Sequence, residues 1–150
     1  MSIPAELLRP FRPRAARWVA SVLFVLSVLA LPALLLVMAV NRLEMPWTDV
    51  VGFTVTAAAL AWLCFRQAAV RAVPDDTGIT VRNFIRVRRL DWAQVVSVRF
   101  GPNSPWAQLD LSDGTTLAVM AVQSADGDHG RREAGRLAAL VQLHEPGQPG

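Results

Sequence analysis

Residues 18–40 read WVASVLFVLSVLALPALLLVMAV, a run without a single charged side chain. As a helix rising about 1.5 Å per residue, this run spans roughly 34 Å, enough to cross a hydrocarbon core of about 30 Å. Pro32 interrupts it, but a membrane helix tolerates proline where a neighbouring helix or a serine side chain satisfies the freed backbone group. Trp18 stands at its edge, where interfacial aromatic residues concentrate. The run therefore predicts a transmembrane helix over residues 18–40.

A second apolar run follows after a short polar connection. Residues 41–49 read NRLEMPWTD, and residues 50–65 read VVGFTVTAAALAWLCF. The second run is near the lower length limit for a membrane span, and the two residues before it can extend it. Its glycine and alanines permit close packing on the first helix. We expect a transmembrane hairpin with an extracytoplasmic loop over 41–49 and a second span over 50–65.

The distribution of arginine predicts the side of the membrane on which each part lies. Residues 1–17 carry four arginines against one acidic residue, and two more arginines follow the second run closely. The positive-inside rule then places both termini and the soluble part in the cytoplasm, as in a multi-pass protein of the cell (inner) membrane. From Asp75 onward, eight arginines nearly balance nine acidic residues. A nearly neutral domain argues against nucleic acid as a partner.

Two other interpretations of the apolar runs remain open. The basic start and residues 37–39 suit a cleavable signal peptide, but the core of a signal peptide has only about 7–15 residues, and here a second apolar run follows at once. The runs could also be buried core helices of a soluble protein, but the rest of the chain is too small to cover both. We also expect the proline-containing basic segment 1–17 and the segment 145–150 to be disordered tails.

Residues 74–144 have the patterning of a small β domain. Alternation of polar and apolar residues begins at Ile79, after the turn-forming sequence PDDTG. A three-residue loop over 83–85 would pair Val81 with Val87 and put the neighbouring arginines on the other face. A third strand is expected over 95–100, with Val96, Val98 and Phe100 facing inward.

A second hairpin and a helix complete this domain. Residues 106–111 and 115–120 flank the sequence SDG, and a type I turn with Gly114 left-handed would pair Leu109 with Leu117 and Ala107 with Val119. Residues 129–144 carry an apolar stripe at helical spacing, with Asp126 or Asp128 available to cap the helix. The expected fold class is α+β: an N-terminal two-helix transmembrane hairpin followed by about five antiparallel strands and a C-terminal helix.

Several short motifs carry a family resemblance: GITVRN at 78–83, LDW at 90–92, VVSV at 95–98, LSDG at 111–114 and MAVQSADG at 120–127. With them, the chain resembles the bacterial PH-domain proteins of actinobacteria, small two-helix membrane proteins of the low-molecular-weight protein antigen 6 type. The resemblance covers essentially the whole chain. It implies a pleckstrin-homology-like fold over residues 74–144, and it supplies no catalytic residues.

The sequence holds few groups for catalysis. His129 and His144 fall near opposite ends of one predicted helix, roughly 22 Å apart, so they cannot share a site. The lone Cys64 lies in an apolar run, and the sequence has no glycine-rich phosphate loop. Asp126 and Asp128 beside His129 fit a helix cap better than a metal site. We therefore expect neither an enzyme nor a cofactor nor a metal.

Arg82, Arg86 and Arg88 are the candidate binding residues. Arginines facing one another on adjacent strands repel unless an anion intervenes, and a domain tethered to a membrane has anionic headgroups close by. The other interpretation is a solvated face that deters edge-to-edge pairing. Trp106 shares its face with polar residues, which makes it a candidate partner contact if it is exposed and a packing residue if it is not.

The expected function is therefore binding or scaffolding without catalysis. The β domain would recruit or position a protein partner at the cytoplasmic face, in contact with the lipid bilayer. The alternative is an accessory subunit of a larger envelope or transport complex, in which the helices make the contacts and the β domain is a structural cap. The sequence leaves the partner, the lipid and the oligomeric state open.

Overall fold

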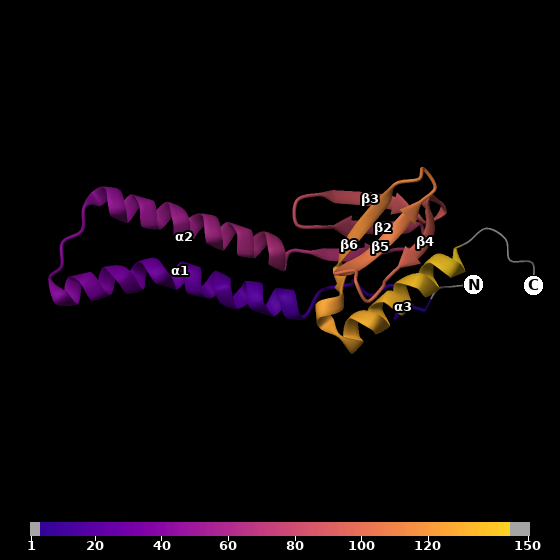
Figure 1. The fold of residues 1–150 in the computed structure, drawn as a ribbon, viewed down its shortest axis with the longest axis horizontal. Coiled ribbons are helices and arrows are strands. Elements are labelled where there is room, and N and C mark those ends of the chain that lie inside the picture. Colours follow the sequence, from indigo (N-terminus) through magenta and orange to yellow (C-terminus); the bar gives the residue numbers. More distant parts are fainter. Residues whose placement is uncertain (1–3, 145–150) are drawn as a thin grey trace, which may run out of the picture. The chain divides into compact units, whose positions relative to one another are not determined.

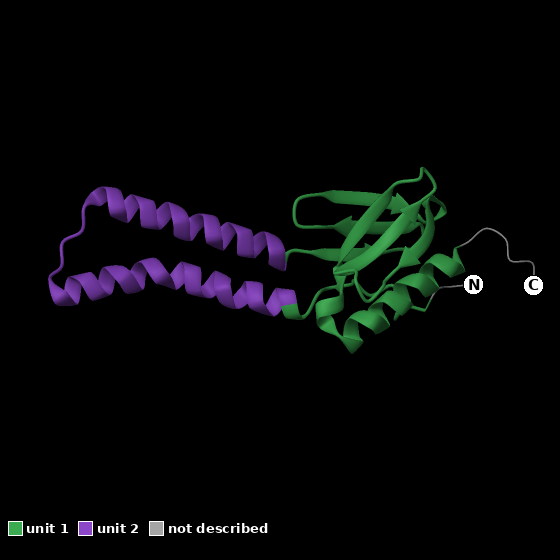
Figure 2. Ribbon diagram, in the orientation of Figure 1, with its two compact units in different colours: residues 1–15, 69–150 green, residues 16–68 purple. Residues whose placement is uncertain are grey.

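The computed structural model describes residues 4–144, which divide into two units (Figure 2). One unit is residues 16–68, and the other combines the described residues of 1–15 and 69–150. Two long apolar helices, two three-stranded antiparallel sheets and a C-terminal helix make this an α+β protein (Figure 1), as the sequence predicts. The predicted tail over 145–150 lies outside the described residues.

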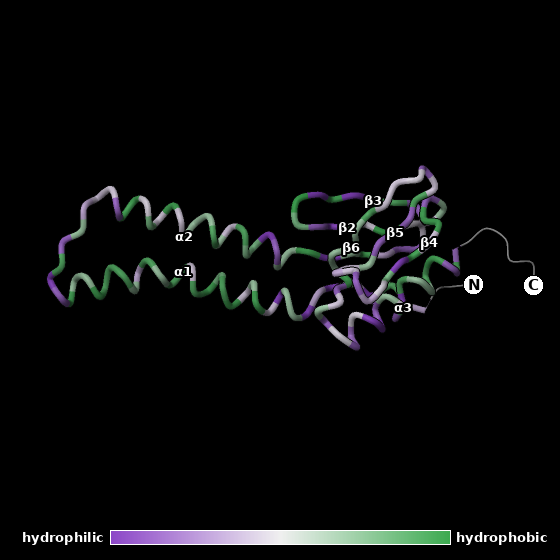
Figure 3. The backbone as a smooth tube through the Cα atoms, viewed as in Figure 1, coloured by the Kyte–Doolittle hydropathy of each residue, from purple (hydrophilic) through white to green (hydrophobic). Residues whose placement is uncertain are grey.

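The unit of residues 16–68 (unit 2 in Figure 2) is a pair of apolar helices. Helix α1 covers Ala15–Asn41 and includes Pro32, and helix α2 covers Trp47–Ala68. Both are long and apolar enough to cross a membrane, and the most apolar window of neither helix is buried. The hydropathy colouring shows the contrast with the polar segment that connects them (Figure 3). Each helix extends a few residues beyond its predicted limits, because the flanking polar residues continue the helical hydrogen bonding.

The other unit, the β domain (unit 1 in Figure 2), has six strands in its described residues, where the sequence predicts about five. Its two sheets have the strand orders β1-β2-β3 and β4-β5-β6, and each neighbouring pair is antiparallel. The elements are β1 (Arg71–Pro74), β2 (Gly78–Arg82), β3 (Val87–Asp91), β4 (Val95–Arg99), β5 (Trp106–Leu111), β6 (Thr116–Gln123) and α3 (Asp128–Leu143). The additional strand is β1, which the sequence analysis treats as a linker.

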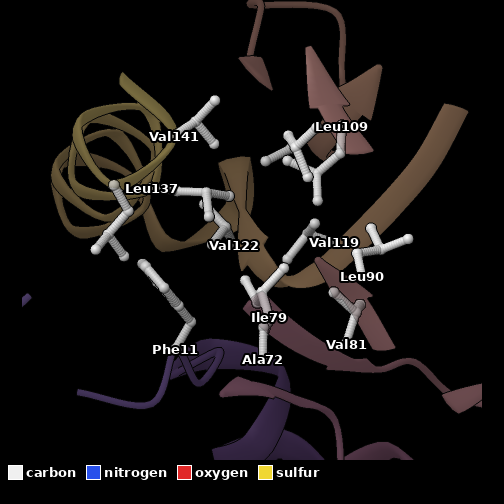
Figure 4. Close-up of a cluster of buried hydrophobic side chains, with 14 of the residues drawn as sticks. Phe11, Ala72, Ile79, Val81, Leu90, Leu109, Val119, Val122, Leu137 and Val141 are labelled. Atoms are coloured by element: carbon white, nitrogen blue, oxygen red, sulfur yellow. The ribbon is translucent and has the colours of Figure 1, made fainter. Parts of the chain in front are cut away.

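Both sheets and α3 contribute to one hydrophobic core (Figure 4). Ile79 comes from the first sheet, Leu109 and Val119 from the second, and Leu137 from α3. Helix α3 approaches β6 closely at Gly130, where a Cβ atom would lie 2.0 Å from the carbonyl oxygen of Gln123. Burying a large aliphatic side chain is worth about 1.5–3 kcal/mol, so this shared core is what holds the two sheets and the helix together.

The β5–β6 hairpin has the predicted register. Leu109 pairs with Leu117 and Ala107 with Val119, and Gly114 has a φ of 80°, in the left-handed region. Asp113 accepts hydrogen bonds from the backbone and hydroxyl of Thr115, which closes the turn. Turn chemistry and apolar alternation favour the same register here, which explains why a local argument succeeds.

The β2–β3 hairpin differs from the prediction. Arg82 pairs with Val87, so the loop has four residues, and Val81 pairs with Arg88 instead of Val87. Val87 is consequently 62% exposed, while Leu90, opposite Ile79, supplies the buried apolar contact. The prediction assumed that both valines face the core, but one of them lies on the outer face.

A β-bulge in β4 changes which of its side chains face the core, so the prediction for this strand is wrong at Val96. The register shifts between Val95 and Ser97, and Val95 is buried while Val96 is 54% exposed. Val98 still packs on the core, as predicted. An extra residue in one strand reverses the alternation locally, so period-two reasoning fails at that position.

The N-terminal segment is part of the β domain instead of a disordered tail. The backbone of Phe11 exchanges two hydrogen bonds with Ala72 of β1, at 2.7 and 3.0 Å, and its side chain is 0% exposed. The Arg136 guanidinium of α3 lies 3.8 Å from the centroid of the Phe11 ring, and its Nη1 donates to carbonyl oxygens of the segment 6–9. Burial of one aromatic ring, which composition does not reveal, orders a proline-rich basic segment.

Replacing Phe11 by alanine should destabilise the β domain. A Phe→Ala change in a core costs about 3–5 kcal/mol, from lost burial and from the cavity left behind. The check is the free energy of unfolding of the full chain in detergent micelles, followed by the fluorescence of the buried Trp92. The matched control is Arg12→Ala at the exposed neighbouring position. Equal stability of the two variants would show that the segment is not part of the core.

Candidate functional site

Strand pairing brings Arg71 and Arg82 together at one end of the first sheet. They are directly opposite on β1 and β2, so they share the outer face, and Arg82 is opposite Val87 on β3. Side chains directly opposite in an antiparallel pair have Cβ atoms about 5 Å apart, and like charges at that separation destabilise the pair. Arg86 is exposed in the β2–β3 turn, which continues from the same end of the sheet. We call Arg71, Arg82 and Arg86 the arginine cluster.

The β2–β3 turn, residues 83–86, is held by Asn83. Its backbone N–H donates to the carbonyl of Arg86 at 2.9 Å. Its side-chain amide donates to the carbonyl of Ala118 at 2.7 Å and accepts the N–H of Met120 at 3.1 Å. A side-chain amide thus satisfies backbone groups of β6 that no neighbouring strand pairs. The turn is fixed to the second sheet, so the residues it carries are held in place.

Two of the three predicted arginines belong to the cluster, and Arg88 does not. Arg88 shares a face with Val81, opposite that of Arg82, and its guanidinium lies 3.8 Å from the carboxylate of Asp113. Arg71 was not among the predicted residues, although it lies on the outer face directly opposite Arg82. The signal for Arg71 was the short apolar alternation RAVP at 71–74, which continues into the strand pattern of 78–82.

The cluster stands out because its charges are not balanced. Within residues 4–144, the arginines that form ion pairs are Arg88, Arg89, Arg99, Arg131 and Arg136. None of these belongs to the cluster. Three guanidinium groups at one end of a sheet, with no carboxylate bonded to them in the described part of the chain, make this end of the β domain attractive to anions.

Exposed apolar side chains lie beside the arginine cluster. Ile85 in the turn is 76% exposed, and Val87 is next to Arg86 in sequence and opposite Arg82 in the sheet. In the described part of the β domain, no other large aliphatic side chain is as exposed as these two. The end of the hairpin therefore combines cationic and apolar surface.

The opposite end of the same sheet is acidic and internally bonded. The Asp75 carboxylate accepts hydrogen bonds from the Thr77 backbone and hydroxyl and from the Gly78 N–H, and it pairs with Arg89 at 2.7 Å. Arg89 and then Thr77 hold the pKa of Asp75 far below its ordinary value of 3.8. The adjoining Asp76 is exposed. The two ends of the sheet thus differ in charge.

The remaining predicted candidates are structural or are separated from one another. Trp106 is half-buried at a bulge, where it pairs with Gln123, so it is not the exposed anchor that the alternation allowed. Trp92 is buried, donates its indole N–H to the Asp75 carbonyl at 2.9 Å and stacks on His144. Residues 4–144 contain no group of three histidine, cysteine or acidic side chains placed to hold a metal ion.

The aspartates near the start of α3 do not have their predicted role. The N-cap of α3 is Gly127, and no side chain caps the helix there. Asp126 instead accepts the backbone N–H groups of Arg14 and Ala15, at 3.0 and 2.8 Å. It therefore caps the start of α1, whose first turn contains no acidic residue of its own.

Two three-stranded antiparallel sheets around one core, followed by a C-terminal helix, define a domain of the pleckstrin-homology-like class. Residues 68–139 match the family model described as Bacterial PH domain. This match covers most of the β domain, and it agrees with the resemblance that the sequence motifs indicate.

The relatives found by sequence are mycobacterial. The chain is 30% identical over 98 residues to uncharacterised proteins of Mycobacterium tuberculosis and Mycobacterium bovis, a match that covers 65% of this chain and 64% of each relative. It is 37% identical over 60 residues to low molecular weight protein antigen 6 of Mycobacterium tuberculosis, covering 40% of this chain and 53% of that protein. The chain thus spans less than two thirds of the length of these relatives, and the matches are shorter than the whole-chain resemblance expected from the motifs. No solved structure gives a significant match.

The Asp75 network predicts a pH-dependent contribution to stability. Because the pKa of Asp75 is lowered on folding, its stabilisation is fully present above the ordinary value of 3.8 and is lost as the pH falls below that value. Asp75→Asn should cost about 1 kcal/mol at neutral pH, since the ion pair is solvent-exposed. Unfolding curves between neutral and acidic pH should show the variant and the wild type converging at low pH. Asp76→Asn is the control, and a difference from wild type that persists in acid would contradict the assignment.

Asn83→Asp should loosen the turn that carries Arg86. The carboxylate still accepts the N–H of Met120, but it has no donor for the carbonyl of Ala118. One of its oxygens then lies next to that carbonyl oxygen. Leaving such a group unsatisfied costs about 1–3 kcal/mol. Unfolding measurements and hydrogen exchange at the Met120 amide test this. Asn103→Asp, in an exposed loop, makes the same chemical change and should have little effect.

Proposed function

We propose that this protein is a membrane-anchored binding module without catalytic activity. In this proposal α1 and α2 cross the cell membrane, and the PH-like domain recruits or positions a partner at the cytoplasmic face. The observation that carries the proposal is the double attachment of the domain to the apolar hairpin. The β domain contains chain from both sides of residues 16–68, and residues from both of these segments share its core.

The two attachments are short and bonded. On one side, Phe11 pairs with Ala72, and Asp126 binds the N–H groups at the start of α1. On the other side, only two residues separate the end of α2 at Ala68 from the start of β1 at Arg71. A domain joined on both sides in this way has little freedom to leave the membrane surface. Such an arrangement suits a module that holds a partner at a fixed place.

The charge of the flanking segments supports the cytoplasmic orientation. Four arginines precede the first apolar run, and Arg66 and Arg71 follow the second. The connection between α1 and α2 contains Arg42 and Glu44, and Asp49 lies in the first turn of α2. Membrane insertion retains arginine-rich flanks in the cytoplasm, so this distribution favours a cytoplasmic β domain.

Cysteine labelling of the full chain tests both the anchoring and the orientation. Cys64→Ala removes the one native thiol, and a single cysteine is then introduced either in the α1–α2 connection, as Leu43→Cys, or in the exposed β5–β6 turn, as Ser112→Cys. In bacterial spheroplasts, a membrane-impermeant maleimide should label Leu43→Cys and should not label Ser112→Cys.

Permeabilisation provides the control for this experiment. After detergent treatment both variants should react, which shows that each thiol is accessible. Labelling of Ser112→Cys in intact spheroplasts would place the domain outside, and recovery of the chain in the soluble fraction would contradict the anchoring.

A further inference from the structure

We infer that the tip of the β2–β3 hairpin is a contact site for anionic lipid, at which Arg71, Arg82 and Arg86 meet headgroups while Ile85 and Val87 enter the interface. The inference rests on the proposed function, since it requires α1 and α2 to lie in the bilayer. It adds the chemical nature of a ligand and the residues that bind it.

The first argument is the place of the tip along the chain. Arg71 is the first residue of β1 and is opposite the last residue of β2, Arg82, so the β2–β3 turn lies at the end of the sheet where the chain enters from α2. The three Cα-to-Cα steps from Ala68 to Arg71 span at most about 11 Å. The end of a membrane-crossing α2 therefore keeps this end of the sheet close to the headgroup layer, and the acidic Asp75 turn is at the other end.

The second argument is the composition of the surface. Anionic headgroups attract arginine, and aliphatic side chains next to those arginines gain by leaving water at the interface. Ile85 and Val87 are 76% and 62% exposed, and the β2–β3 register places them among the cluster arginines. A small protein domain rarely leaves its most exposed aliphatic groups beside unbalanced charge unless something covers both. A lipid surface offers a complement to both at once.

The third argument is that the tip is already held in position. Asn83 fixes the turn to β6 through both ends of its side-chain amide, and its backbone closes the turn onto Arg86. The repulsion between Arg71 and Arg82 is built into the pairing of β1 with β2. An anion between the two guanidinium groups relieves that repulsion without any change in the backbone. Little ordering cost then opposes binding.

The test uses the full chain, purified and reconstituted in nanodiscs without any other protein. In the Cys64→Ala background, Ile85→Cys carries an environment-sensitive fluorophore, and the nanodiscs contain phosphatidylcholine alone or an equimolar mixture with phosphatidylglycerol. We expect a blue shift and quenching by spin-labelled lipid in the anionic nanodiscs. The fluorophore at Asp76→Cys, at the opposite end of the sheet, should show neither.

A matched pair of charge variants identifies the residues responsible. Adding Arg82→Gln and Arg86→Gln should reduce the ratio of lipid-contacting to free tip about tenfold or more, since each arginine near an anionic surface contributes several-fold. Adding Arg131→Gln and Arg132→Gln on exposed α3 positions removes the same charge and should leave the quenching unchanged. All of these positions have solvent-facing side chains, and retained protease resistance shows that each variant is folded.

The outcomes separate this inference from the proposed function. Equal quenching in both lipid mixtures, or equal loss in both charge variants, overturns the lipid site. The fluorophore could instead stay in water in nanodiscs while Ile85→Cys is protected from maleimide in native membranes. That combination would point to a protein partner and would also overturn the lipid site. In either case a domain that is cytoplasmic by cysteine labelling leaves the proposed function standing.

Discussion

The burial of Phe11 is the contact on which the rest of the arrangement depends. Its ring lies under the guanidinium of Arg136, and its backbone pairs with Ala72. Together with Leu7, Leu8 and the buried Pro13, it makes the segment before the apolar helices part of the same core as the strand after them. The β domain is therefore discontinuous in sequence. The contact of Phe11 with the core and the bonds of Asp126 to Arg14 and Ala15 all lie within the β domain.

The functional significance of the charge pattern in the first sheet depends on this double attachment. The sheet has an arginine-rich end, where the chain enters from α2, and an acidic end, where Asp75 is neutralised by Arg89. Internal pairing removes Arg88 and Arg89 from the set of available cations and leaves Arg71, Arg82 and Arg86. Which arginines are available is thus decided by strand pairing and ion pairs, and the sequence shows only that arginines are frequent here.

The match of residues 68–139 to the bacterial PH-domain model agrees with the architecture and assigns no chemistry to it. The side chains that usually carry catalysis are scattered or structural here. His144 stacks on Trp92, and Asp126 serves α1. The exposed features that remain are the arginine cluster and the aliphatic groups beside it, which suit binding at a surface.

The sequence by itself determined the features that depend on neighbouring residues. The apolar run over 18–40 exceeds the length of a bilayer core, the run over 50–65 is near the lower limit, and both lie in helices that are long and apolar enough to cross a membrane. The β5–β6 register follows from alternation together with the left-handed Gly114, because turn geometry and side-chain facing agree within a dozen residues. Tertiary structure alone decided the features that depend on distant contacts. The β2–β3 register depends on the hydrogen bonds of the Asn83 amide to β6. The N-terminal segment is ordered because the Phe11 ring is buried beneath α3. The start of α1 is capped by Asp126, which is more than a hundred residues away in the sequence. A contact between residues that are far apart in the sequence leaves no periodic pattern around either of them. For that reason the arginine cluster was only partly predicted.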